Sequence, residues 1–205
     1  MRTTMHTLLA AAAAFTLTAS TPAITTIEAN LAQIVQYTDQ AFVGTVTASE
    51  VVQLDNGRWA ERITVSVSEG VLGDADAGEA VTWHQARPNQ YAAYCGMPQF
   101  QVGQDYLVFL GASAPGSQFT APVALGQGAF VVTTNENGVQ VARNGYGNGN
   151  LFNGVDVQAL SSAAAAPIDA TTVDGIAAAA QALESSGNPQ AFSTAPGEGL
   201  SIDGN

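Results

Sequence analysis

The chain has 205 residues, and its 17 acidic and five basic residues give a formal net charge of −12. The basic residues are five scattered Arg and no Lys, which excludes nucleic-acid binding and attraction to an anionic membrane surface, because both need clustered cations. A single Cys excludes an internal disulfide framework, and a hydrophobic content of 46% is enough for a folded core.

Residues 1–23 have the pattern of a secretory signal peptide. Arg2 supplies a positive start, and residues 8–17 form an apolar run that is too short to cross about 30 Å of hydrocarbon as a helix. Small residues follow, with an A-x-A-like cleavage site at Ala23 and an alternative cut after Ser20. We therefore expect export, with the mature chain secreted or periplasmic and without a membrane span.

A short helix and a long β-hairpin are predicted next. Apolar residues at helical spacing over residues 27–40 indicate the helix. Residues 41–54 and 58–69 are rich in β-branched residues and alternate with period two, and the Asp-Asn-Gly sequence between them favours a type I′ turn. Gly44 in the first strand indicates a bend or a close approach of another backbone.

Further short strands follow in chain order. Residues 79–85 form a shorter strand, and residues 104–111, the most apolar run of the body, should be a central strand. Residues 126–134 and 139–143 flank a second hairpin turn of sequence Asn-Glu-Asn-Gly. Strands with turns at this spacing are typical of a small antiparallel barrel or sandwich.

The composition changes after the last predicted strand. Residues 171–185 have helical spacing, and Thr171 with Asp174 suggests a capping box, so we expect a helix that packs on the barrel. The predicted organisation is a signal peptide (1–23), a barrel domain (24–145), a linker with the C-terminal helix (146–186) and a flexible tail (187–205).

Four segments resemble a largely uncharacterised family of exported bacterial proteins that have a small OB-fold-like barrel of the netrin and metalloprotease-inhibitor type. They are residues 31–46, 63–73, 96–110 and 125–132; the third is the most specific, with Pro98, Phe100 and Gly103 before its apolar run. Leu72 departs from the family, whose members often have a basic residue there. The resemblance implies a mainly β fold: a five- to six-stranded antiparallel OB-like barrel with a short N-terminal helix and a C-terminal helix. It implies no catalytic residues.

Cys95 and His84 are the candidate pair for nucleophilic catalysis, because a thiol needs a base or a positive field to become a thiolate. They lie 11 positions apart across an irregular stretch. Two alternatives stand beside this one: a small buried Cys, or an exposed reactive thiol that forms an intermolecular disulfide. The exposure of Cys95 and its contact with His84 discriminate between them.

Acidic and aromatic residues supply two further candidates. Asp74, Asp76 and Glu79 offer oxygen ligands for Ca²⁺, but their spacing does not continue as an EF-hand loop, which favours a polar turn. Aromatic residues could line a ligand face of the kind on which OB-type barrels bind oligosaccharides, or they could belong to the core. The candidates for this face are Trp59, Trp83, Tyr91 and Tyr94, with Tyr106 as a further aromatic.

These observations favour an exported, non-enzymatic binding module with a protein or saccharide partner, and we expect no cofactor and no metal. An inhibitor-like module acting on an extracellular protease is an alternative, although no Cys lies near the expected mature N-terminus to chelate a protease metal. A hydrolase that uses Cys95 and His84 is the other alternative.

Overall fold

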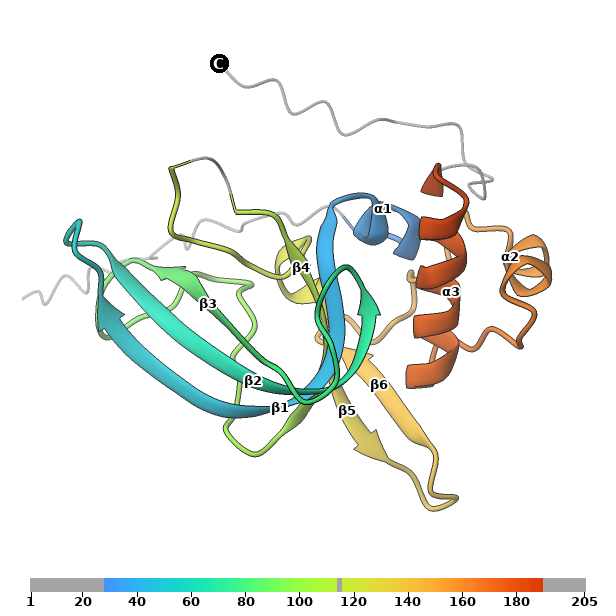
Figure 1. Ribbon diagram of the computed structural model, residues 1–205, viewed down its shortest axis with the longest axis horizontal. Coiled ribbons are helices and arrows are strands. Elements are labelled where there is room, and N and C mark those ends of the chain that lie inside the picture. The colour runs from blue at the N-terminus through green and yellow to red at the C-terminus, as the bar shows by residue number, and fades with distance from the viewer. Residues whose placement is uncertain (1–27, 114–115, 190–205) are drawn as a thin grey trace, which may run out of the picture.

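The computed structural model describes residues 28–113 and 116–189. Six strands form one antiparallel sheet in the order β3-β2-β1-β4-β5-β6 (Figure 1). The strands are β1 (Thr38–Gln53), β2 (Trp59–Leu72), β3 (Ala80–Arg87), β4 (Asp105–Gly111), β5 (Ala129–Thr134) and β6 (Gln140–Asn144). The predicted signal peptide and most of the predicted tail lie outside the described residues.

Three α-helices and one 3-10 helix complete the described part of the chain. They are α1 (Leu31–Gln36), η1 (Leu125–Gly128), α2 (Val157–Ala164) and α3 (Val173–Ser185). The mainly β fold, with six antiparallel strands, a short helix on the N-terminal side and a C-terminal helix, is confirmed. The sheet is not closed by strand pairing, and α2 lies where only a linker was expected. No helix in the described ranges is long and apolar enough to cross a membrane.

The first hairpin turn differs from the expected type I′ geometry, and the second hairpin turn has the same form. In the first, the N–H of Gly57 donates to the carbonyl of Leu54 at 2.8 Å, and Gly57 has a φ of +80° whereas Asn56 does not have a positive φ. Gly138 donates to Asn135 in the same way and has a φ of +77°. Both loops are therefore longer turns closed by one left-handed glycine, so the type I′ prediction for the first turn was wrong, whereas the second was predicted only as a hairpin turn.

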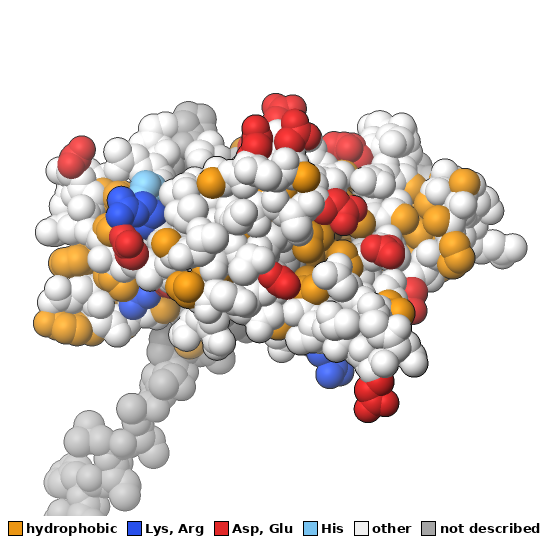
Figure 2. Space-filling view, turned by 60° about the horizontal axis from the view of Figure 1, so that its bottom comes forward, with side chains coloured by type: hydrophobic (Ala, Val, Ile, Leu, Met, Phe, Trp, Pro, Cys, Tyr) orange, Lys and Arg blue, Asp and Glu red, His pale blue; other side chains and the backbone are white. Residues whose placement is uncertain are grey.

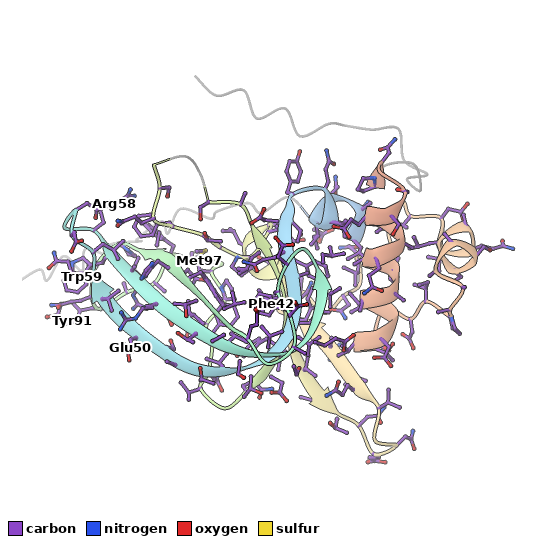
Figure 3. The ribbon with its side chains drawn as sticks, viewed as in Figure 1. Phe42, Glu50, Arg58, Trp59, Tyr91 and Met97 are labelled. Carbon is purple, nitrogen blue, oxygen red and sulfur yellow. The ribbon has the colours of Figure 1, made fainter. Side chains whose placement is uncertain are left out.

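The central strands are buried on both faces, because the sheet separates two hydrophobic cores. Alternate residues of β1 and β4 point into the curved part of the sheet, where Phe42, Val108 and Tyr106 form the barrel core with residues of β2 and β3 (Figure 3). The residues between them, such as Leu107 and Phe109, form the helix-side core with α1 and α3. The continuous apolar run that predicted a central strand at β4 is therefore explained, because its side chains pack into a hydrophobic core on each face of the sheet.

An irregular segment lies between β4 and the edge strand β3, which are not paired with each other. Segment 120–123 continues along the edge of β4 beyond the short pairing with β5, and it also reaches β3. Its backbone hydrogen bonds are Val123 N–H to Phe109 C=O (2.9 Å), Gly111 N–H to Ala121 C=O (3.1 Å) and Thr120 N–H to His84 C=O (2.9 Å). We call this junction the seam.

The start of α3 also differs in detail from the prediction. The N-cap is Thr172, whose hydroxyl accepts a hydrogen bond from the N–H of Gly175 at 3.1 Å. The predicted capping box of Thr171 and Asp174 is therefore wrong: the N-cap is the next residue, Thr172, and Gly175, three residues further on, has no side chain to complete a box. Gly175 is required here, since a Cβ at this position would lie 2.4 Å from the carbonyl oxygen of Asp169.

Candidate functional site

A polar hollow of about 210 Å³ opens at the seam. We call it the seam pocket. Its lining comes from β1, β3, the end of β4 and the segment that follows β4: Asp39, Gln40, Thr82, Trp83, His84, Leu110, Gly111, Ser113, Gln118 and Thr120. A pocket forms here because the outer edge of β3, which is not paired with β2, meets the segment that follows β4 through the Thr120–His84 backbone hydrogen bond and not through a continuous strand ladder.

Strand geometry decides which side chains reach the pocket. Successive residues of β3 point to opposite faces, so buried Trp83 belongs to the barrel core while its neighbour His84 is half-buried on the other face. The indole of Trp83 packs edge-on against Phe100, with ring centroids 5.1 Å apart. On the opposite side of the pocket, Gln40 of β1 lies directly across from Leu110 of β4.

The pocket is lined by side chains that can donate and accept hydrogen bonds. Gln40 and Gln118 carry amides, and the hydroxyl groups of Ser113 and Thr120 are hydrogen-bonded to each other. The indole Nε1 of Trp83 is buried and has no hydrogen-bond partner within the described residues. Because this nitrogen has almost no accessible surface and its ring lies in the barrel core, the unsatisfied donor is a cost to the stability of the fold and is not a contact point for a ligand.

Asp39 is the formally charged residue among those that line the pocket. It is exposed, and its carboxylate makes no hydrogen bond or ion pair with any part of the chain that the structure describes. His84 faces Arg62 across strands β2 and β3, but Arg62 is held by Glu50 at 2.6 Å. Figure 2 shows that acidic side chains are spread over the face in view and that basic side chains are sparse there.

The predicted Cys95–His84 pair is not assembled. Cys95 is exposed in the loop between β3 and β4, it does not line the seam pocket, and no hydrogen bond joins it to His84 in the described ranges. His84 instead shares the pocket with Asp39 and Ser113, a carboxylate and a hydroxyl. No hydrogen bond links any two of these three within the part of the chain described here, so no nucleophile is activated by a base.

The four aromatic candidates do not share one surface. Trp83 is 4% exposed and lies in the barrel core, whereas Tyr91 is 86% exposed and Tyr94 is 48% exposed. Trp59 is half-buried at the start of β2 and lies at the same end of the molecule as Tyr91 (Figure 3). Tyr106 belongs to the barrel core, and its hydroxyl donates to the carbonyl of Gln99 at 3.2 Å.

A buried polar group near Trp59 was not predicted. Arg87 donates to Glu61 at 2.7 Å, and Ser49 donates to the other carboxylate oxygen at the same distance. Arg87 Nε and the side-chain oxygen of Gln85 have no partner within the described residues. The alternation of strand residues could have indicated this group, because Gln85 and Arg87 lie two and four positions after Trp83 and therefore point to the same, inward face of β3.

The acidic candidates form a turn. Asp74, Asp76 and Glu79 are all exposed, and the Glu79 carboxylate accepts a hydrogen bond from the backbone N–H of Asp76 at 3.3 Å. Within the ranges described, no group of three or more His, Cys, Asp or Glu side chains could hold a metal ion.

Of the residues that line the seam pocket, the sequence pointed only to His84 and Trp83. The others are ordinary polar residues from separate segments, and no spacing connects them. Comparison with protein-family models and with curated proteins finds no match to this chain. Its function is therefore argued from the pocket itself.

Proposed function

We propose that this protein is an exported, non-enzymatic binding module that takes a small polar molecule into the seam pocket. The observation that carries the proposal is a polar hollow whose lining brings a carboxylate, an imidazole, amides and hydroxyl groups together from separate segments of the chain. At about 210 Å³, the hollow is smaller than the range of about 300–1,000 Å³ that is typical of drug-sized ligands. Export rests on the signal-peptide pattern of residues 1–23.

Binding is favoured over catalysis because the groups that could react are not coupled. The pocket does contain a carboxylate, an imidazole and a hydroxyl, which supports hydrolysis as a second candidate. A base-activated nucleophile needs hydrogen-bond contact with its base, and neither Ser113 nor Cys95 has that contact with His84 in the described residues. We expect no turnover across a broad hydrolase panel; activity that is lost in His84→Ala would establish the second candidate instead.

The test is a screen of small polar compounds by ¹H–¹⁵N NMR on the mature protein. Substituting Trp59→Phe leaves Trp83 as the sole tryptophan, so a single indole N–H signal reports on a residue of the pocket lining. A binder should shift this signal, and Gln118→Ala should weaken its binding.

Gln101→Ala is the matched control, because Gln101 is exposed and is not among the residues that line the pocket. Compounds that bind without moving the Trp83 signal, or equally well to the Gln118 and Gln101 variants, would place binding elsewhere and contradict the proposal.

A further inference from the structure

We propose that residues 24–27 of this chain dock into an apolar groove of the barrel and cover it as a strap. The groove has a volume of about 320 Å³ and is lined by the loop before β4, by β4, η1 and β5, and by the turn that follows β6. We call it the β5 groove. It shares no residue with the seam pocket, so this inference is independent of the proposed function.

The β5 groove presents apolar side chains at the surface of an acidic protein. Val131 is 39% exposed and Tyr146 is 48% exposed, while Pro98 and Met97, which is labelled in Figure 3, are half-buried. None of the described residues that line the groove carries a charge at neutral pH. Such a surface favours an apolar, uncharged occupant, because covering it removes apolar area from water.

The described part of the chain begins beside this groove. The backbone N–H of Ala29 donates to the side-chain oxygen of Gln127 at 2.7 Å, and Gln127 belongs to η1, which contributes to the groove. Glu28 and Tyr146 line a neighbouring hollow together, and Tyr146 lines the β5 groove as well. Residues 24–27 are therefore attached next to the groove, within reach of it, since four residues span up to about 14 Å.

The sequence of this segment suits the groove. Residues 24–27 read Ile-Thr-Thr-Ile, without a charged side chain. Ile24 and Ile27 are three positions apart, a spacing that puts both side chains on the same side of a helical turn or of a polyproline II segment. The groove has space equal to that of about ten water molecules, which is enough for two isoleucine side chains.

The tether favours this segment over a second copy of the chain. A short linker gives the segment an effective concentration in the millimolar range at the groove. A second copy carries the same formal charge of −12 and is repelled by the first. The strap is thus a device built into the chain that covers an apolar surface, and its release exposes that surface again.

Methyl NMR on the mature protein tests the strap. Isoleucine and methionine methyl groups are labelled with ¹³C, and Met97 gives a single signal because it is the sole methionine after residue 23. We expect nuclear Overhauser effects from Ile24 and Ile27 to the Met97 methyl group and to the ring of Tyr146. Replacing both isoleucines, Ile24→Ser and Ile27→Ser, should abolish these contacts and shift the Met97 signal.

Thr25→Ser and Thr26→Ser together are the matched control, since they change the same segment but keep both isoleucines. This control should retain the contacts and leave the Met97 signal in place. Absence of the contacts from the unmodified protein, or a Met97 signal that is the same in the two double variants, overturns the strap. Contacts that occur only between labelled and unlabelled chains in a mixed sample assign the groove to a second copy and overturn it too.

Discussion

Two ion pairs join neighbouring strands, and they differ in how deeply their side chains are buried. Arg87 and Glu61 approach to 2.7 Å with side chains only 13% and 10% exposed, whereas Arg62 and Glu50 approach to 2.6 Å with side chains 48% and 55% exposed. Water screens the second pair but hardly reaches the first. Removing one partner of a buried pair leaves a desolvated charge, which costs far more than losing an exposed contact.

Glu61→Ala should therefore lower the free energy of unfolding by about 3 kcal/mol, because Arg87 would keep its charge without a partner. Glu50→Ala is the matched control and should cost less than about 1 kcal/mol. Urea denaturation followed by tryptophan fluorescence measures both values. Equal losses in the two variants would show that burial does not govern the first pair.

Asp169, next to the start of α3, has a pKa below its ordinary value of 3.8. The larger cause is a hydrogen bond from the hydroxyl of Thr171, and a second comes from the backbone N–H of the same residue. Both favour the carboxylate over the acid.

Because the folded-state pKa of Asp169 is the lower one, its contribution to stability is present above the unfolded-state value and disappears as the pH falls through the folded-state value. Thr171→Val should raise the pKa of Asp169 toward 3.8, which an NMR titration of the carboxyl group measures. It should also flatten the loss of stability in acid. An unchanged titration curve would mean that the Thr171 hydroxyl does not lower the pKa of Asp169.

At the scale of the elements, Gly44 lets β1 and β2 approach each other within the curved hairpin. A Cβ at this position would lie 2.4 Å from the carbonyl oxygen of Ser66 and 2.6 Å from a methyl carbon of Val65. The predicted close backbone approach at Gly44 is thus confirmed. Register shifts in the β1–β2 ladder lie on either side of this contact, where the hairpin bends.

Gly44→Ala should destabilise the fold by about 1–3 kcal/mol, since a backbone atom would have to move to make room. Gly149→Ala is the control, because open space surrounds that position. Thermal unfolding followed by circular dichroism compares the two variants. A melting temperature for Gly44→Ala equal to that of the control would mean that the hairpin absorbs the methyl group without strain.

The predicted elements were most accurate where a long periodic pattern existed. The β1–β2 hairpin and β4 lie within a few residues of their predicted bounds. Helix α2 was missed because Leu160 is its one buried residue, so it has no apolar stripe to detect. Residues 126–128, expected at the start of a strand, belong to η1, where Gly128 packs against the backbone of Val123.

At the scale of the whole molecule, β1 and β4 couple the two cores, because each strand contributes alternate side chains to both. Trp83 lies in the barrel core, and α3 packs on the helix-side core. We expect the tryptophan fluorescence of Trp59→Phe and the helical circular dichroism to report one unfolding transition with the same midpoint in urea.

Leu107→Ala and Val108→Ala extend this test, since adjacent β4 residues belong to the helix-side core and the barrel core respectively. Each should lower the midpoint of both signals together, by about 2–5 kcal/mol for the leucine and less for the smaller valine. Helix loss before any change in the Trp83 signal would show that the two cores unfold independently.

The sequence alone determined the alternating strands, the two hairpin loops, the doubly buried central strand and the C-terminal helix. Each of these depends on periodicity or turn chemistry over a short stretch of chain, which can be recognised without knowing which distant residues lie nearby in the fold. The seam pocket was decided only by the tertiary structure. Hydrogen bonds between segments distant in the sequence bring Asp39 and His84 into the lining of one pocket, and no local pattern encodes that meeting.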